Sequence, residues 1–329
     1  MITACRPLFL METVPMVGRK PEFSIPVVDM SAYLHNNRDL DELDSVVSQI
    51  RLACSTSGFF QIVGHGISQK MQDSVLCASK ALFSLGEEEK LKLKAKPGVG
   101  YETFGSQTLE AGKKPDLKEG YFFSREIPGL QPPYKPFCTP NIWPETNLLP
   151  EEEFKSPLLS YHTAMHELAV RILDLLARGL NISNTSIMKD FCREPIATVR
   201  LLHYPPHPDI NDNTMVGAGA HTDFGAITIL LTDGNSGLQV LNQSTKEWID
   251  VPPRSDAFVV NIGDLLQTWT SGHYKSNIHR VINTSGQERY SVPFFFDGNP
   301  EFLVEPLDGS ATEKYTVREH LLLRYKQSF

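Results

Sequence analysis

The stretch that decides the fold runs from Ala220-His221-Thr222-Asp223-Phe224-Gly225, through Asn277-Ile278-His279-Arg280-Val281-Ile282, to Arg289-Tyr290-Ser291-Val292. The first segment leads into the apolar run 226–231, and the other two are themselves strand-like. His279 follows Asp223 by 56 residues, and Arg289 follows His279 by ten, which is enough for a tight turn and an antiparallel return. The pattern predicts β-strands that bring these segments together.

The functional hypothesis is a metal site formed by His221, Asp223 and His279. Two imidazoles and one carboxylate are the ligand set of a non-haem iron(II) that keeps three coordination positions open. Because side chains two residues apart on a strand point to the same side, Arg289 and Ser291 can together bind a carboxylate beside the metal. An H-x-D triplet alone is weak evidence, so the prediction depends on the conjunction of all three segments.

Other histidines are interpreted as structural. His207-Pro208-Asp209 repeats the H-x-D pattern, but it follows two prolines and leads into a polar turn, which indicates solvated loop residues. His65 lies in a Gly-His-Gly turn and is interpreted as a hydrogen-bonded structural residue. His162 and His166 lie four residues apart on a predicted helix, a spacing that can bind a metal, but no further ligand is evident and we expect exposed helix positions.

Segments along most of the chain, from about Phe23 to the C-terminus, resemble the iron(II)/2-oxoglutarate dioxygenases of the isopenicillin N synthase-like superfamily. That family shows H-x-D, then a second His, then R-x-S. Further similar segments are 59–67 (FFQIVGHGI), 202–206 (LHYPP), 237–240 (GLQV) and 261–264 (NIGD). Segments 116–121 (DLKEGY) and 141–144 (NIWP) are similar to the branch found in fungal specialised metabolism. Gly64 and Leu202 stand where the family usually has Asn.

The resemblance implies a mainly β fold with flanking helices, a double-stranded β-helix or jelly roll whose open mouth holds the metal. It implies iron(II) as cofactor, 2-oxoglutarate as co-substrate, dioxygen as oxidant and ascorbate as a supporting reductant. Arg289 would bind the distal carboxylate of 2-oxoglutarate with two parallel hydrogen bonds, and Ser291 and Tyr204 would each add one.

The implied reaction oxidises a C–H bond of a small organic molecule in specialised (secondary) metabolite biosynthesis and releases succinate and carbon dioxide. Hydroxylation, desaturation, cyclisation and ring rearrangement stay open. Two alternatives also stay open: an oxidase of the same fold that does not use 2-oxoglutarate, and a jelly-roll binding protein. Succinate formation that requires 2-oxoglutarate separates the oxygenase from the oxidase.

Strand parity extends the predicted pocket beyond the metal. Arg200 shares a strand face with Leu202 and Tyr204, so we expect it to orient a polar or anionic substrate. Phe295 shares a face with Arg289 and Ser291 and is a candidate pocket wall, with core packing as the equal alternative. The Gly-, Pro- and aromatic-rich segment 97–157 offers further pocket candidates, with core packing again the equal alternative: Tyr101, Phe104, Tyr121 and Phe123.

The remaining elements follow from periodicity. Strand-like runs are expected at 198–204, 226–231, 238–241, 257–261, 278–282 and 290–296. Apolar positions at helical spacing predict helices from a capping Asp39 to Gly58, over 69–83 and 87–93, and from an N-cap at Ser156 to Gly179. We expect a flexible arm over 1–22 and a single domain over 23–329, with a helical part over about 23–180 and a jelly-roll core over about 195–305.

The composition limits the kinds of binding partner that are expected. The formal net charge is −8 with no basic cluster, which argues against nucleic acid. No apolar run has the length of a membrane span, and Glu12 and Pro15 interrupt the N-terminal apolar run, which argues against a signal peptide. Five cysteines without C-x-x-C spacing favour free thiols and a cytoplasmic location. We expect a small-molecule substrate and a monomer or homodimer.

Overall fold

The computed structural model describes residues 23–34, 40–94, 98–182, 185–209, 212, 214–310 and 314–328. The arm expected over 1–22 and the capping residue Asp39 lie outside these residues. The helices are α1 (Ser31–Leu34), α2 (Leu40–Thr56), α3 (Gln69–Phe83), α4 (Glu87–Lys92), α5 (Lys155–Gly179), α6 (Thr185–Phe191), α7 (Asp264–Trp269) and α8 (Val317–Ser328).

Two sheets form the centre of the molecule. The large sheet has the order β1 (Val27–Asp29), β2 (Phe59–Val63), β10 (Phe258–Ile262), β7 (Ile227–Thr232), β12 (Arg289–Gly298), β5 (Ile196–Tyr204), β4 (Glu119–Ser124), β3 (Gly100–Glu102). The small sheet has the order β6 (Ala218–His221), β11 (His279–Val281), β8 (Leu238–Leu241), β9 (Trp248–Asp250). A short pair, β13 (Leu303–Val304) and β14 (Tyr315–Thr316), precedes α8. The expected jelly roll is confirmed, and each of the six expected strand runs is a strand.

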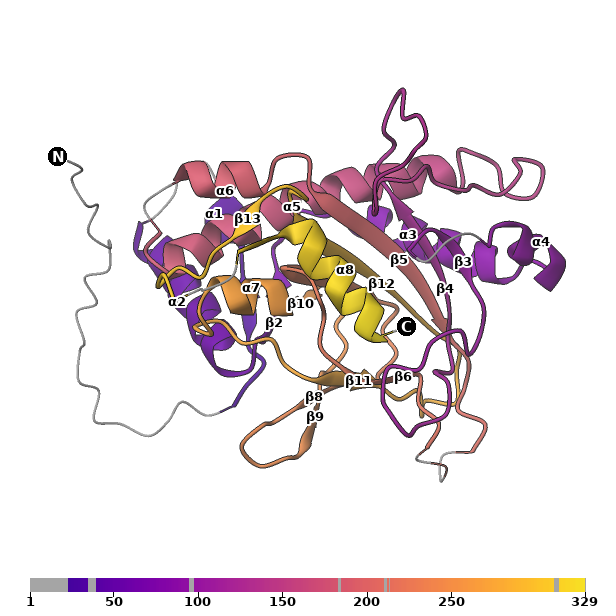
Figure 1. Ribbon diagram of the computed structural model, residues 1–329. Coiled ribbons are helices and arrows are strands. Elements are labelled where there is room, and N and C mark those ends of the chain that lie inside the picture. The colour runs from indigo at the N-terminus through magenta and orange to yellow at the C-terminus, as the bar shows by residue number, and fades with distance from the viewer. Residues whose placement is uncertain are drawn as a thin grey trace.

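Alternation along the strands of the large sheet separates two apolar cores. Val199 and Phe294 belong to the larger core, which the helices α2, α3 and α5 cover, and α5 runs along the sheet in Figure 1. Leu202 on β5 points the other way and packs with Val240 and Val281 of the small sheet. Because successive side chains on a strand face opposite sides, one face of the large sheet supports the helices while the other faces the small sheet.

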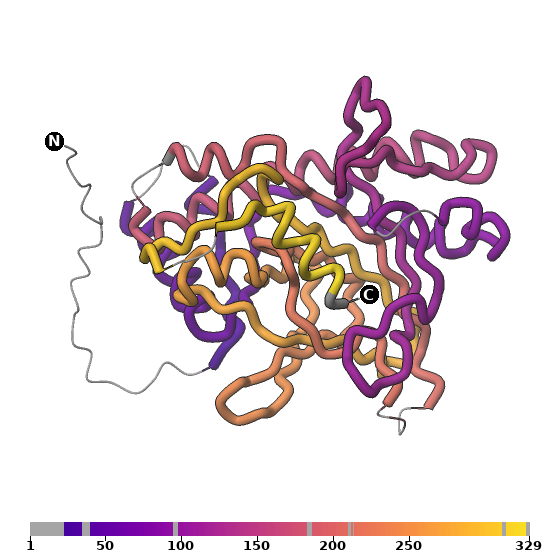
Figure 2. The backbone as a smooth tube through the Cα atoms, viewed as in Figure 1, coloured from indigo at the N-terminus to yellow at the C-terminus, as the bar shows by residue number. Residues whose placement is uncertain are grey.

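A segment over 103–118 covers the outer edge of β6. Glu110 Oε2 accepts a hydrogen bond from the Ala220 N–H (2.9 Å), and Asp116 Oδ1 accepts one from the Gly219 N–H (3.0 Å). Figure 2 shows this purple loop at the lower right, beside β6. A Cβ added at Gly219 would lie 2.7 Å from the Glu110 Cβ, so only glycine allows this approach. The segment therefore supplies hydrogen-bond acceptors for backbone N–H groups at the edge of β6, the strand that ends at His221.

Some expectations were wrong in detail. Helix α5 has Phe154 at its N-cap, two residues before the expected cap Ser156. His162 is buried rather than exposed, with its Nε2 3.0 Å from the Ala197 carbonyl oxygen. For the aromatic residues of segment 97–157, the equal alternative of core packing holds for Tyr101, Tyr121 and Phe123, while Phe104 is exposed, and none of the four lines the cavity described below. Within the described ranges, no helix has both the length and the apolar character to span a bilayer.

Candidate metal and co-substrate site

The small sheet brings the two predicted imidazole ligands together. Strands β6 and β11 are antiparallel, and their register sets His221 directly opposite His279. The ring centroids lie 4.3 Å apart, and each Nε2 lies 3.8 Å from Asp223 Oδ1. The potential ligand atoms of the three residues all lie within 4.8 Å of one another. This compact, partly open trio has the donor set and size of a facial metal site.

Backbone carbonyls orient both imidazoles. His221 Nδ1 lies 2.7 Å from the Gly219 oxygen, and His279 Nδ1 lies 3.2 Å from the Asn277 oxygen. A carbonyl oxygen only accepts, so each Nδ1 carries the proton and each Nε2 presents its lone pair to the centre of the trio. Such contacts fix the tautomer and ring orientation of metal-binding histidines.

The Asp223 carboxylate is oriented by two neighbouring strands of the large sheet. Its Oδ2 accepts hydrogen bonds from Thr228 Oγ1 (2.5 Å) and Asn261 Nδ2 (2.8 Å). Thr228 on β7 and Asn261 on β10 are cross-strand partners, so the sheet register itself places both donors. Oδ1 is thereby left to face the two Nε2 atoms.

The environment sets the protonation states that a cation requires. Burial, followed by the neighbouring His279, lowers the pKa of His221, which keeps its imidazole neutral. Burial alone would raise the pKa of Asp223, but the two imidazoles and the bonds from Asn261 and Thr228 hold that pKa below its usual value. A neutral imidazole and an ionised carboxylate are the forms that bind metal. The trio therefore fits iron(II).

Removing the hydroxyl beside Asp223 should weaken metal binding. Thr228→Val keeps the side-chain volume but deletes the bond to Oδ2, so we expect iron(II) affinity to fall roughly tenfold to hundredfold. Thr228→Ser keeps the hydroxyl and should remain close to wild type. Anaerobic competition titration with a chelator measures both affinities. Equal iron affinity in the Val and Ser variants would show that the Oδ2 bond does not orient the ligand.

Arg289 lies on the opposite wall of the same cavity. Its side chain is 1% exposed, and its Nε and Nη1 make no hydrogen bond with any described residue. The guanidinium stacks over the Tyr204 ring with the Cζ 5.0 Å from the centroid, because β12 and β5 pair Arg289 with Tyr204. A buried charge without a partner is costly, so this arrangement calls for an anion. A carboxylate of 2-oxoglutarate fits these donors.

The cavity between the sheets encloses about 570 Å³, including space open to solvent, a size suited to small ligands. Every residue expected at the site lines it: His221, Asp223, His279, Arg289, Ser291, Tyr204, Arg200 and Phe295. Strand parity had predicted that Arg200 and Phe295 face this side. His207, from the second H-x-D triplet, does not line the cavity, and its Nε2 lies 2.7 Å from the Met215 carbonyl oxygen.

Lys118 is a cavity residue that sequence reasoning missed. It is buried and forms an ion pair with Asp116, and burial, then the charge of Arg200, lowers its pKa to about 8. Arg200 itself is paired with Glu102 and lies over the Phe122 ring, 4.6 Å from its centroid. Lys118 precedes Gly120 and Phe122 of β4 by two and four residues, so its side chain is expected on the same face of the sheet. This spacing could have placed Lys118 in the cavity if β4 had been predicted to pair with β5.

Comparisons with known proteins agree with this geometry. Residues 195–298 match the model of the 2OG-Fe(II) oxygenase superfamily, and residues 25–146 match that of the non-haem dioxygenase in morphine synthesis N-terminal region. The chain is 42% identical to the 2-oxoglutarate-dependent dioxygenase citB of Monascus ruber, covering 94% of this chain and 96% of that one. It is 37% identical to the clavatol oxidase claD of Penicillium crustosum, covering 94% and 98%.

A solved structure is also similar. A full-length Neurospora crassa protein in complex with alpha-KG and thymine superimposes with a TM-score of 0.80 at 27% sequence identity, over 93% of this chain and 97% of that one. The similarity extends over both the helical part and the two sheets.

Proposed function

The chain belongs to the 2OG-Fe(II) oxygenase superfamily and is an iron(II)- and 2-oxoglutarate-dependent oxygenase, and we propose that its iron is held by His221, Asp223 and His279. Arg289, with Ser291 and Tyr204, binds the distal carboxylate of 2-oxoglutarate. The observation that carries the assignment is a buried guanidinium whose Nε and Nη1 have no hydrogen-bond partner among the described residues and which lines the same cavity as the trio. The 2-oxoglutarate-independent oxidase and the binding protein are disfavoured by relatives that are 2-oxoglutarate-dependent dioxygenases.

When bound, iron(II) and 2-oxoglutarate supply the activation of dioxygen that oxidises a substrate C–H bond, with release of succinate and carbon dioxide. The protein contributes positioning and a dry environment. The apolar side chains of Phe59, Leu109 and Val281 line the cavity and limit water there. The decisive experiment measures succinate formed by iron-loaded protein with and without 2-oxoglutarate. Turnover that needs no 2-oxoglutarate would favour the oxidase.

We also propose that residues 23–329 act as one catalytic domain. Phe59 and Lys118 from the helical part and Arg289 from the jelly-roll part contribute walls to one cavity, and β2 is inserted beside β10 in the large sheet. A cytoplasmic location is proposed on the ground that the four described cysteines form no disulfide. A monomer or homodimer stays the expectation.

The proposed substrate is a small, polar organic molecule of specialised metabolism, oriented by Arg200 and packed against Phe295. Clavatol and thymine, the molecules in the relatives' names, are reasonable first candidates. Both offer oxygen atoms that a cationic donor can bind. Lys118 beside Arg200 strengthens the preference for such a group.

Removing the Arg200 charge should affect the primary substrate more than the co-substrate. Arg200→Met loses one charged hydrogen bond, so we expect the KM of the best substrate to rise roughly tenfold to hundredfold, with 2-oxoglutarate affinity nearly unchanged. Arg193→Met, at an exposed arginine just after α6, is the control. Succinate assays with varied substrate give both constants. An unchanged substrate KM would remove Arg200 from the substrate site.

A further inference from the structure

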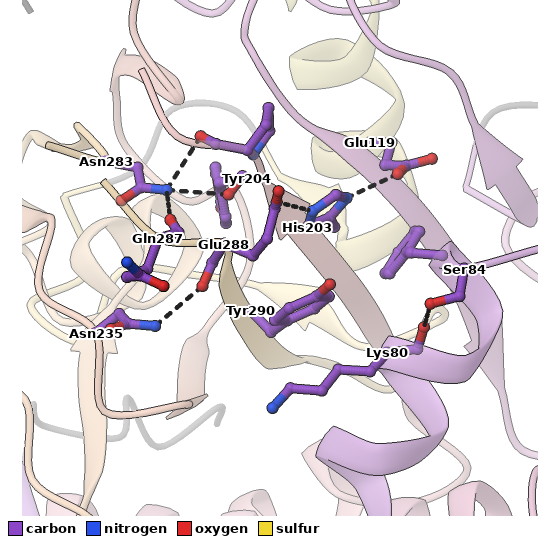
Figure 3. Close-up of polar contacts among 12 residues, drawn as sticks. Lys80, Ser84, Glu119, His203, Tyr204, Asn235, Asn283, Gln287, Glu288 and Tyr290 are labelled. Atoms are coloured by element: carbon purple, nitrogen blue, oxygen red, sulfur yellow. Dashed lines mark hydrogen bonds and ion pairs between the residues drawn. The ribbon is translucent and has the colours of Figure 1, made fainter. Parts of the chain in front are cut away.

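The strand that carries Arg289 and Ser291 has a polar contact on its opposite face. Between these two residues stands Tyr290, whose side chain points away from the cavity and pairs across the sheet with His203 of β5. The two rings are stacked, with centroids 4.8 Å apart and planes 14° from parallel. Figure 3 shows His203 and Tyr290 together, with Glu119 and Glu288 on either side of the imidazole.

Both ring nitrogens of His203 meet a carboxylate. Nδ1 lies 2.7 Å from Glu119 Oε1, and Nε2 lies 2.6 Å from Glu288 Oε2. An ionised carboxylate can only accept, so both nitrogens must carry protons and the ring is an imidazolium. The Glu119 side chain is 1% exposed while that of Glu288 is 53% exposed. His203 therefore links a buried anchor on β4 to an exposed carboxylate that immediately precedes Arg289.

Further charged, polar and aromatic groups surround the ring and its buried carboxylate partner. Glu119 Oε2 accepts from Lys90 Nζ (2.8 Å) on α4 and from the Tyr101 hydroxyl (2.5 Å) on β3. Lys80 on α3 lies over the Tyr290 ring at 5.5 Å, and the rings of Phe83 and Phe104 also contact His203. Burial alone would lower the pKa of His203, but the bonds to Glu119 and Glu288 raise it above its usual value.

The backbone on both sides of Arg289 is also fixed by side chains. Asn235 Nδ2 donates to the Glu288 carbonyl oxygen (3.0 Å), and the Tyr290 N–H donates to Asp233 Oδ2 (2.8 Å). Asn283 Nδ2 donates to the Tyr204 and Gln287 carbonyl oxygens (3.0 and 2.8 Å). These contacts hold the connection over 283–288, which joins β11 of the small sheet to β12 of the large sheet. Because these two strands do not pair, the expected antiparallel return from His279 to Arg289 is wrong. The bridge from Glu288 to His203 ties this connection to β5 through side chains.

We propose that His203 is a positioning residue for co-substrate binding: as an imidazolium held between Glu119 and Glu288, it fixes Tyr290 and with it the flanking Arg289 and Ser291. This inference rests on the proposed role of Arg289 and Ser291. A neutral imidazole has one N–H, so it can serve one carboxylate only. Because Glu119 is buried, Glu288 is the partner that is released. The residue before Arg289 then loses its side-chain bond to β5, while the backbone pairing of β12 with β5 remains.

The pH dependence follows from the sign of the shift. The pKa of His203 is higher in the folded protein than in the unfolded chain, where it is about 6.5. The stabilisation by the imidazolium is therefore fully present below about pH 6.5 and is lost as pH rises through the folded-state pKa. Affinity for 2-oxoglutarate should therefore fall above neutral pH. Lys118 lies in the cavity with a pKa lowered to about 8, so it titrates in an overlapping range. Variants of the His203 bridge are needed to separate the two contributions.

The test uses the full chain loaded with iron(II) without dioxygen, and 2-oxoglutarate itself as the probe. Calorimetry gives its Kd between pH values of about 6.5 and 9, and NMR of histidine-labelled protein gives the pKa of His203, assigned by the loss of its resonance in His203→Gln. Glu288→Gln keeps an acceptor for Nε2 but removes the charge. We expect it to lower the NMR midpoint and the alkaline midpoint of the Kd together. Glu247→Gln, at an exposed residue before β9, should change neither.

His203→Gln should raise the Kd for 2-oxoglutarate at neutral pH by about fivefold, the effect of one typical hydrogen bond, and remove the His203 component of the alkaline loss. Its KM for 2-oxoglutarate should rise while kcat at saturating 2-oxoglutarate stays within about twofold. If Glu288→Gln and His203→Gln both keep the wild-type Kd at every pH, the positioning role is overturned. If Arg289→Ala also keeps that Kd, it is the proposed co-substrate site that fails.

Discussion

Replacing His279 by alanine is expected to abolish iron(II) binding and turnover while the fold survives. Only one imidazole and one carboxylate would remain of the trio, and loss of one ligand should cost on the order of 3 kcal/mol or more, a hundredfold or greater loss in affinity. His221→Ala and Asp223→Ala should behave alike. The fold should tolerate the change because His279 has opposite effects on its two partners, lowering the pKa of the His221 imidazole while favouring the ionised Asp223 carboxylate, so its loss is partly offset.

Anaerobic titration with iron(II), followed by the shift in Tm on metal addition, measures this effect. Metal that binds the folded state raises Tm to an extent that grows with its affinity, so the wild type should shift and the His279→Ala protein should not. His207→Ala is the matched control, since His207 bonds within its own turn outside the cavity. Full iron binding by the His279→Ala protein would remove His279 from the ligand set.

Arg289→Ala is expected to raise the KM for 2-oxoglutarate by at least about 30-fold while leaving iron binding nearly unchanged. Removing one partner of a buried charged pair costs about 2–5 kcal/mol, or roughly 30-fold to several-thousand-fold in affinity. The unbound protein should lose little stability, because the guanidinium Nε and Nη1 have no partner among the described residues. The loss should therefore appear in binding rather than in folding.

Two further substitutions should have smaller effects on the KM for 2-oxoglutarate. Arg289→Lys keeps the charge but loses the planar fork, so its KM should lie between those of the wild type and Arg289→Ala. Ser291→Ala deletes one hydrogen bond to a charged acceptor and should cost about 1.5–3 kcal/mol. Succinate formation at saturating iron and ascorbate gives each KM. Wild-type dependence on 2-oxoglutarate in Arg289→Ala would mean that another residue binds the distal carboxylate.

The sequence alone predicted the trio of candidate metal ligands, the Arg-Ser pair and the faces of two strands. These features are local, because the direction of side chains alternates along a strand with a period of two. Arg200 and Tyr204 could therefore be assigned to one face of their strand, and Ser291 and Phe295 to one face of theirs, before any partner strand was known. The apolar run that follows Asp223 likewise required a buried strand whatever its neighbours. The resemblance to a known family then supplied the double-stranded β-helix form of the fold and the co-substrate, which the spacing of strand-like runs does not specify.

Only the tertiary structure decided which distant residues complete the site. Thr228 and Asn261 reach Asp223 because β7 and β10 pair in one particular register, and no local pattern in the chain specifies that register. Lys118 faces the cavity because β4 pairs with β5, and the same pairing sets Glu119 against His203. His162 is buried because α5 lies across the sheet, a packing choice that helical periodicity left open. Long-range strand pairing brings these polar residues together, so that Thr228 and Asn261 orient the Asp223 carboxylate and Glu119 contacts His203.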